Sequence, residues 1–238
     1  MKAFVFAAGL GTRLKPLTDT MPKALVPVNG KPLLAHVMEK LQGCGIHSFV
    51  VNVHHFANQI VQYLQNQWSE TEVAISDETD ALLETGGAIK KAQPLLGNES
   101  FLIHNVDILS NADVMTLMQL HHQQKAAATL LVSQRKSSRY LLFDEQMRLK
   151  AWTNTQTGQV KTPYKNLDIS TLKPYAFSGI HGFSPVLFDA MQNYPDKFSI
   201  IDFYLDQCLN YPIYGYEQPD LKLLDVGKLD SLKQAENF

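Results

Sequence analysis

The residues that could do chemistry gather in one stretch near the N-terminus. Gly9-Leu10-Gly11-Thr12-Arg13 follows a short apolar run, and Lys23 comes soon after. Glycine lets backbone N–H groups approach a ligand and adopt positive φ, and consecutive N–H groups in such a turn bind anions. Arg13 offers a planar set of donors to phosphate oxygens, and Lys23 offers a compact positive charge. Gly9 and Gly11 therefore allow positive φ, and we expect a loop suited to holding a triphosphate.

Two better-known nucleotide motifs do not fit this stretch. The dinucleotide fingerprint needs a third glycine where Leu14 stands, and no Gly-Lys-Ser or Gly-Lys-Thr follows to complete a P-loop. An ordinary glycine-containing turn would explain the two glycines alone. The addition of Arg13, the turn Pro16-Leu17-Thr18 and the pair Pro22-Lys23 favours a phosphate-binding loop.

Two aspartates are candidate metal ligands. Asp107 follows the apolar run Phe101–Val106, which places it at the carboxyl end of a predicted strand, where open α/β sheets bind ligands. Asp225 lies within Leu223–Gly227, and a carboxylate among apolar residues is costly unless something compensates its charge. Two carboxylates beside nucleotide phosphates suit Mg²⁺. The alternatives are a helix cap for Asp107 and a buried ion pair with a lysine for Asp225.

Taken together, these segments resemble the sugar-1-phosphate nucleotidyltransferase family. The resemblance covers nearly the whole chain. Its segments are Gly9–Leu14, Pro22–Val28, Gly30–Leu33, Leu83–Ile89, Asn105–Asp107, Phe177–Ile180 and Leu224–Gly227. Within the family, the Leu-Glu-Thr-Gly-Gly segment and the short chain are most similar to N-acetylmuramate-1-phosphate uridylyltransferases. Mannose-1-phosphate guanylyltransferases are nearly as similar.

The resemblance implies Mg²⁺-dependent transfer of a nucleotidyl group from a nucleoside triphosphate, UTP being favoured, to a sugar 1-phosphate, with release of pyrophosphate. It implies catalytic roles for Arg13 and Lys23, and metal binding by Asp107 and Asp225. The implied nucleotide-binding residues are Ala7, Ala8, Gly9, Gly11, Thr12, Glu84 and Gly86, and the implied sugar-binding residues are Thr85, Asn105, Ser178 and Gly179. For a lysine that grips the sugar phosphate, Lys150, Lys161 and Lys165 are equal candidates. The segment 84–87 is also a candidate helix start with Thr85 as its cap, and both interpretations can hold together.

Val106 stands where relatives commonly have glycine, directly before the first metal aspartate. Because a β-branched residue restricts the backbone, we expect it to narrow the sugar pocket or shift Asp107. Val106 therefore motivates one alternative, a nucleotide-sugar-binding protein without turnover. The other alternative, suggested by the resemblance, is a guanylyltransferase for mannose or heptose 1-phosphate. A choline-phosphate cytidylyltransferase is disfavoured, since Phe177–Ile180 and Leu224–Gly227 resemble the sugar branch.

Strand and helix patterns alternate through the first half of the chain, which predicts a Rossmann-like α/β fold with a mostly parallel sheet and helices on both faces. The expected strands are 3–8, 49–53, 72–75, 101–106 and 128–132, and the expected helices are 32–41, 57–68, 87–96 and 112–124. The second half predicts strands 140–143, 148–152, 175–183 and 221–226, helices 184–192 and 200–209, and a last helix from 228. The polar segment 154–173 favours a small β lid over about 136–175, although a plain surface loop has the same composition. Residues 1–238 are expected to form one domain, with no hexapeptide repeat that would build a C-terminal β-helix.

The formal net charge of −2 excludes a bulk electrostatic attraction to nucleic acid, and no stretch is long enough to cross a bilayer. Cys44 and Cys208 lie far apart and are expected to be reduced thiols in a cytoplasmic protein, with one disulfide as the alternative. The expected partners are the nucleoside triphosphate and the sugar 1-phosphate, and the expected state is a monomer or a small homo-oligomer. The pairs His54-His55 and His121-His122 are predicted to lie at the surface or at caps. The segment Asp77–Asp80 is predicted to be a solvated acidic turn near the mouth of the site.

Overall fold

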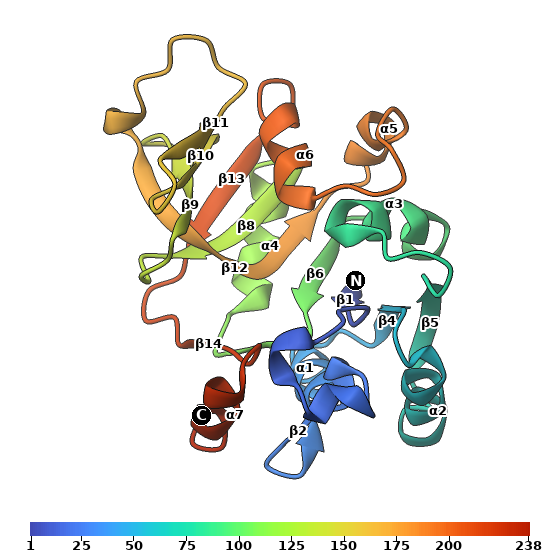
Figure 1. Ribbon diagram of the computed structural model, residues 1–238. Helices are drawn as coiled ribbons and strands as arrows, with labels where there is room; N and C mark the ends of the chain where they lie inside the picture. The colour runs from blue at the N-terminus through green and yellow to red at the C-terminus, as the bar shows by residue number, and fades with distance from the viewer.

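A ten-stranded sheet runs through the computed structural model, which describes residues 1–238 (Figure 1). Its strands are β1 (Lys2–Phe6), β4 (Ser48–Val53), β5 (Glu72–Asp77), β6 (Phe101–Asn105), β8 (Ala128–Ser133), β9 (Arg139–Phe143), β10 (Leu149–Asn154), β11 (Gln159–Lys161), β12 (Lys173–Phe183) and β13 (Ile213–Glu217). The pairs β1–β4, β4–β5, β1–β6 and β8–β13 are parallel, while β12 runs antiparallel to both β6 and β8. The predicted α/β fold with a mostly parallel sheet is confirmed.

Helices cover both faces of this sheet. They are α1 (Leu33–Gly43), α2 (Ala57–Gln67), α3 (Glu84–Leu96), α4 (Val114–Gln123), α5 (Leu187–Met191), α6 (Ile200–Gln207) and α7 (Leu229–Ala235). One hydrophobic cluster joins α1, α2, α4 and α7 to one face, and a second joins α3, α5 and α6 to the other. The side chains of β1 alternate between them, with Ala3 and Val5 in the first cluster and Phe4 in the second. A strand buried on both faces explains the continuous apolar run at the N-terminus.

The strand β12 connects the sheet to a smaller β region. Its second half pairs with β6 and β8, whereas Lys173–Tyr175 pairs with β9. The antiparallel pairs β9–β10 and β10–β11 complete this region, which we call the β lid. The register of β12 with β8 shifts between Phe177 and His181, where Gly179 has a φ of 75°. A glycine at this point allows the backbone conformation that the shift requires.

Several short elements were not predicted from the sequence. The strand β7 (Ile108–Ser110) was missed; it forms a separate antiparallel pair with β14 (Leu223–Asp225), which lies within the strand expected over 221–226. The strand β2 (Pro27–Val28), which pairs with β3 (Lys31–Pro32), was missed as well. The strand β13 was also missed, although it extends the main sheet beside β8. The remaining short elements are single 3-10 turns: η1 (Thr12–Leu14), η2 (Leu17–Asp19), η3 (Lys23–Leu25) and η4 (Ile169–Thr171).

Two expectations about polar side chains are wrong. His121 is 1% exposed, and its ring nitrogens contact Thr129 Oγ1 and Ser100 Oγ. Glu78 is 0% exposed rather than part of a solvated turn. The helix α4 packs against β8 and buries His121, and the end of β5 turns inward and buries Glu78.

Cys44 and Cys208 are both free thiols, as expected. Burial raises the pKa of the Cys208 thiol to about 11. None of the helices combines the length and the apolar character that crossing a membrane requires.

Candidate active site

The loop after β1 is held in shape by its own side chains. Gly11 has a φ of 64°, and a Cβ at this position would lie 2.8 Å from Thr18 Cγ2. The Thr18 hydroxyl donates to the Gly11 carbonyl oxygen at 2.8 Å. Gly11 uses the positive φ that glycine allows, whereas Gly9 does not. Gly9, Thr12 and Arg13 are exposed, which leaves them open to a ligand.

The structure brings the four predicted charged residues to the same end of the sheet. The Lys23 ammonium pairs with the Asp107 carboxylate. The strands β7 and β14 set Asp225 opposite Ile108, the residue after Asp107, and the Val226 N–H donates to the Asp107 carbonyl oxygen at 2.8 Å. A Cβ on Gly227 would lie 2.6 Å from Asp225 Oδ1 and 2.8 Å from Arg13 Nη2. One cation therefore lies beside each aspartate.

These two carboxylates have the chemistry to bind Mg²⁺. Hard oxygen ligands from one or two carboxylates, completed by waters and phosphate oxygens, are what Mg²⁺ takes in nucleotide sites. Asp225 pairs with Ile108, the residue after Asp107, so the pairing of β7 with β14 brings the two aspartates to the same place in the fold. The Asp225 carboxylate is not desolvated among apolar residues, as the sequence had suggested, because Asp225 is exposed at the end of β14. The ion pair with a lysine that was considered for Asp225 is instead formed by Lys23 with Asp107. Of the His, Cys, Asp and Glu side chains, no three are grouped to hold a metal ion.

A buried polar network that the sequence analysis missed lies beneath the loop. Asn52 Oδ1 accepts from the N–H groups of Ala7 and Ala8 at 2.7 and 3.3 Å, and Asn52 Nδ2 donates to Glu78 Oε1 at 2.7 Å. Glu78 Oε2 accepts from the Leu83 N–H at 3.2 Å. Burial raises the pKa of the Glu78 carboxyl, although the bond from Asn52 opposes this shift. Asn52 is a polar residue inside the apolar run Phe49–Val53, and this feature of the sequence could have indicated the network.

The segment from Leu83 to Gly87 starts α3 and packs against the segment before α6. Glu84 is exposed with a φ of 60°, an uncommon backbone for a residue other than glycine. Thr85 does not cap α3; its hydroxyl accepts from the Ile200 N–H at 3.0 Å. The Gly86 N–H donates to the Phe198 carbonyl oxygen at 2.8 Å, and a Cβ on Gly86 would lie 2.3 Å from the Phe198 ring. The structure thus gives Gly86 a packing role, with its N–H already engaged.

On the predicted sugar side, Gly179 lies against Asn105: a Cβ there would be 2.8 Å from Asn105 Nδ2. Ser178 is 1% exposed and its hydroxyl has no hydrogen-bond partner, so its placement does not support direct contact with a sugar. Val106 is 4% exposed, has a negative φ and belongs to the hydrophobic cluster. The Val106 side chain packs in the core, which does not support a narrowed sugar pocket; its effect on the position of Asp107 stays a prediction.

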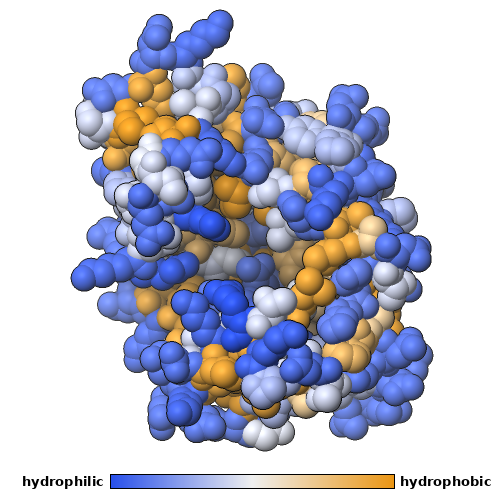
Figure 2. Space-filling model, in the orientation of Figure 1, coloured by the Kyte–Doolittle hydropathy of each residue, from blue (hydrophilic) through white to orange (hydrophobic).

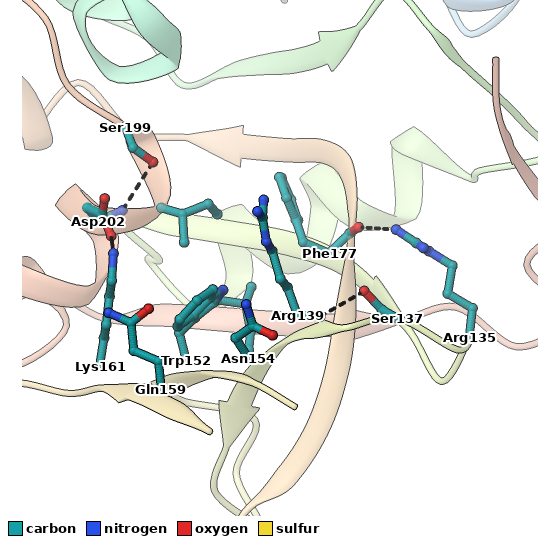
Figure 3. Close-up of a pocket in the computed structure, with 12 residues that line it drawn as sticks. Arg135, Ser137, Arg139, Trp152, Asn154, Gln159, Lys161, Phe177, Ser199 and Asp202 are labelled. Atoms are coloured by element: carbon teal, nitrogen blue, oxygen red, sulfur yellow. Dashed lines mark hydrogen bonds and ion pairs between the residues drawn. The ribbon is translucent and has the colours of Figure 1, made fainter. Parts of the chain in front are cut away.

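A cavity of about 550 Å³ lies between the β lid and the start of α6, with Phe177 of β12 in its wall (Figure 3). Figure 2 shows a hollow on this face, between the part that carries the β lid and the part that carries α1. The lining of the cavity includes Arg135, Arg139, Trp152 and Phe177. Of the three lysines considered for the sugar phosphate, Lys161 is the one that lines this cavity. Lys150 instead pairs with Asp144 at 3.3 Å. No sequence motif had singled out Arg135, Arg139 or Trp152.

Comparison with known proteins agrees with this geometry. The family model described as nucleotidyl transferase matches residues 2–238. The chain belongs to this family.

Two relatives of this chain are named N-acetylmuramate alpha-1-phosphate uridylyltransferase. The one from Caulobacter vibrioides is 44% identical over 108 residues, which are 44% of this chain and 45% of the relative. The one from Neisseria meningitidis is 40% identical over 120 residues, or 50% and 52% of the two chains. The matched region thus spans about half the length of these relatives. Proteins named mannose-1-phosphate guanyltransferase also match.

A solved structure with the same fold is HddC from Yersinia pseudotuberculosis, complexed with GMP-PN. Its TM-score is 0.77 at 22% identity, and the match covers 99% of this chain and 98% of that one.

Proposed function

We propose that this chain transfers a uridylyl group from UTP to a sugar 1-phosphate, with N-acetylmuramate 1-phosphate as the favoured acceptor, and releases pyrophosphate. The observation that carries the proposal is the arrangement of Arg13, Lys23, Asp107 and Asp225 at one end of the sheet, beside a glycine loop. The N-acetylmuramate-1-phosphate uridylyltransferases at 44% and 40% identity support the choice of acceptor and base.

In the proposed reaction, an oxygen of the sugar phosphate attacks the α-phosphorus of UTP. The bond from the α-phosphorus to the oxygen that bridges it to the β-phosphorus breaks, and pyrophosphate leaves with that electron pair. The attacking oxygen is already an anion at neutral pH, so no general base is needed. What the protein must supply is alignment of two polyanions and compensation of the charge that grows on the leaving group.

Each charged residue has a defined part in this reaction. Arg13 is exposed in the loop and can donate to triphosphate oxygens, while Lys23 places a positive charge beside Asp107. Asp107 and Asp225 would hold Mg²⁺, which when bound offsets phosphate charge and orients both substrates. Glu84, which is exposed at the start of α3, would contact the base or the ribose. A reaction that uses UTP and a sugar phosphate fits the cytoplasmic location expected from the sequence.

The second candidate is a guanylyltransferase for mannose or heptose 1-phosphate. It is favoured by the matching mannose-1-phosphate guanyltransferases and by the shared fold with HddC, whose structure contains GMP-PN. The alternative of binding without turnover was motivated by Val106. Burial of the Val106 side chain in the core makes this alternative less favoured than catalysis.

One assay tests the proposal. Pyrophosphate release is measured for UTP, GTP, CTP and dTTP against N-acetylmuramate, N-acetylglucosamine, glucose and mannose 1-phosphates, with Mg²⁺ or with EDTA. We expect the highest kcat/KM for UTP with N-acetylmuramate 1-phosphate, and loss of activity in EDTA. Preference for GTP would replace the proposal with the second candidate, and binding without release in every combination would reject catalysis.

A further inference from the structure

We propose that Arg139 recognises a carboxylate on the sugar and so selects acidic sugar 1-phosphates over neutral ones. The inference rests on the proposed function, because it assumes that the cavity under the β lid receives the sugar. It assigns a specificity-determining residue that lies outside the resemblance on which the reaction was proposed.

The cavity lies beside the reacting centre without including it. Phe177 lines it and directly precedes the segment that packs on Asn105, and Ser199 lines it next to Phe198, which accepts from Gly86. None of the four charged residues of the reacting centre belongs to its lining. A sugar whose phosphate lies at Asp107 would therefore extend its far end into this cavity.

The cavity carries more positive than negative charge. Its lining contains Arg135, Arg139 and Lys161 against a single acidic residue, Asp202. That acidic residue is already used, since Asp202 Oδ1 lies 2.6 Å from Lys161 Nζ. This excess of positive charge is a property of the cavity and not of the whole chain, which has a formal net charge of −2.

The two arginines differ in what they already contact. Arg135 Nη2 donates to the Phe177 carbonyl oxygen at 2.9 Å (Figure 3). Arg139 is fixed only through its backbone, whose N–H donates to Ser137 Oγ at 3.1 Å, and its guanidinium has neither an ion pair nor a hydrogen bond within the chain. Figure 3 shows this side chain extending along Phe177 into the cavity. A planar guanidinium without a partner is suited to bind a carboxylate through two hydrogen bonds.

The rest of the wall suits a substituted sugar ring. Trp152, Leu141 and Ile201 offer apolar surface for the C–H face of a ring, while Asn154 and Gln159 offer amide groups to hydroxyl or acetamido groups. A volume of about 550 Å³ lies within the usual range for small-molecule sites. Because the phosphate is needed at the reacting centre, the anion that Arg139 would bind must be a second one on the same sugar. N-acetylmuramate carries such a group, the carboxylate of its lactyl ether.

The test compares two substrates that differ only in that lactyl group, N-acetylmuramate 1-phosphate and N-acetylglucosamine 1-phosphate, each with UTP and Mg²⁺. We expect Arg139→Gln to lower kcat/KM by roughly ten- to a hundredfold for the acidic sugar, as for loss of a charged hydrogen-bonded pair. The neutral sugar should change by less than about threefold, because it has no group for Arg139 to bind. The control is Arg148→Gln, an exposed arginine over the Tyr214 ring that does not line the cavity.

An equal loss for both sugars would overturn the inference, since Arg139 would then hold the phosphate or the fold. No loss for either sugar, or a preference of the native chain for the neutral sugar, would overturn it as well. Binding of the two sugar phosphates is measured in parallel through the fluorescence of Trp152, with Trp68 as the only other tryptophan. Tighter binding of the acidic sugar that depends on Arg139 supports the inference even without turnover, whereas that outcome would reject the proposed reaction.

Discussion

Lys23 and Arg13 each stand next to a carboxylate that could bind a metal ion, and this pairing decides how their loss should be interpreted. The Lys23 ammonium pairs with Asp107, and Arg13 Nη2 shares the space beside Gly227 with Asp225 Oδ1. Without substrate, Lys23 forms an ion pair with Asp107, and the Arg13 guanidinium lies near the Asp225 carboxylate without an ion pair. With the triphosphate bound, the same cations face phosphate oxygens, so their removal acts on the charge that develops during the reaction.

We expect Lys23→Ala and Arg13→Ala each to lower kcat by roughly a hundred- to a thousandfold, the effect of removing one preorganised donor to a transition state. The measurement is steady-state pyrophosphate release at saturating substrates. Lys15→Ala is the matched control, because Lys15 is an exposed lysine of the same loop that pairs only with Asp19. A Lys23→Ala enzyme with nearly native kcat would show that Lys23 has no part in the reaction.

Close packing explains why the motif segment Leu83–Ile89 has a glycine at position 87. A Cβ at this position would lie 1.9 Å from the Asp196 carbonyl oxygen, a backbone atom that no rotamer change can move away. Gly87→Ala should therefore reduce the free energy of unfolding by roughly 1–3 kcal/mol, the usual cost of overpacking. Gly43→Ala is the control: Gly43 lies in the last turn of α1 with nothing near its Cβ position. In urea unfolding, equal midpoints for the two variants would contradict this explanation.

The charged residues of the candidate site could be predicted from the sequence because the family resemblance selects them among residues whose type alone leaves other roles open. Arg13, Lys23, Asp107 and Asp225 come together as expected, although their roles remain predictions. Whether Gly86 or Ser178 faces a ligand depends on which neighbours pack against it, which residue type does not reveal. Arg139 is an ordinary surface arginine in the sequence, and only the cavity around it distinguishes it.

Among the elements, the strong apolar patterns were predictable and the short ones were not. The strand β1 and the helices α1 to α4 bury continuous or periodic apolar faces. The strand β13 reads Ile-Tyr-Gly-Tyr-Glu, with one buried residue at its start, so its sequence has no clear alternation. The strand β7 has three residues and exists through its pairing with β14, more than a hundred residues away. Such pairing is set by tertiary structure rather than by local sequence.

The end of β4 supports two parts of the site through Asn52. One oxygen of this side chain holds the Ala7 and Ala8 amides after β1, and its amide group holds Glu78, which in turn accepts from Leu83 before α3. Asn52→Ala leaves these buried groups without partners. We expect the free energy of unfolding to fall by roughly 1–3 kcal/mol and the KM for the nucleoside triphosphate to rise, since both sides of the expected nucleotide site lose their support.

Urea unfolding and nucleotide kinetics check this prediction. Asn66→Ala is the control, because Asn66 is an exposed asparagine of α2. The pair of Asn52→Ala and Glu78→Ala, measured singly and together, should show a coupling energy above about 0.5 kcal/mol. Additive effects would mean that the two side chains support the site separately.

Across the whole molecule, three histidines are buried between the sheet and its helices. Burial lowers the pKa of His104 and of His121 to about 4, and that of His181 to about 3. Each is therefore neutral in the folded protein well below the ordinary pKa of about 6.5, whereas the unfolded chain takes up a proton there. The contribution of each histidine to stability is complete above pH 6.5 and is lost as the pH falls toward 4, by about 3 kcal/mol for each shift of the pKa to about 4.

His181 offers the sharpest test of this pH dependence. Both of its ring nitrogens are buried without a hydrogen-bond partner, and its neighbours include the rings of Phe177 and Tyr204. In His181→Leu, unfolding between pH 6.5 and 5 should take up one proton fewer than in the native protein, whatever the stability of the variant at pH 7. Urea unfolding at several pH values gives the slope of the unfolding free energy against pH. Hydrogen bonds lower the pKa values of the Asp77 and Asp113 carboxyl groups, so these groups begin to titrate only below this pH range. Burial raises the pKa of Glu78 and acts in the opposite sense in both proteins, so it cancels in the comparison.

His47→Gln, at an exposed position, should leave the slope unchanged. An unchanged slope in His181→Leu would mean that His181 is protonated in the folded state, and the neutral buried cluster would then have to be abandoned.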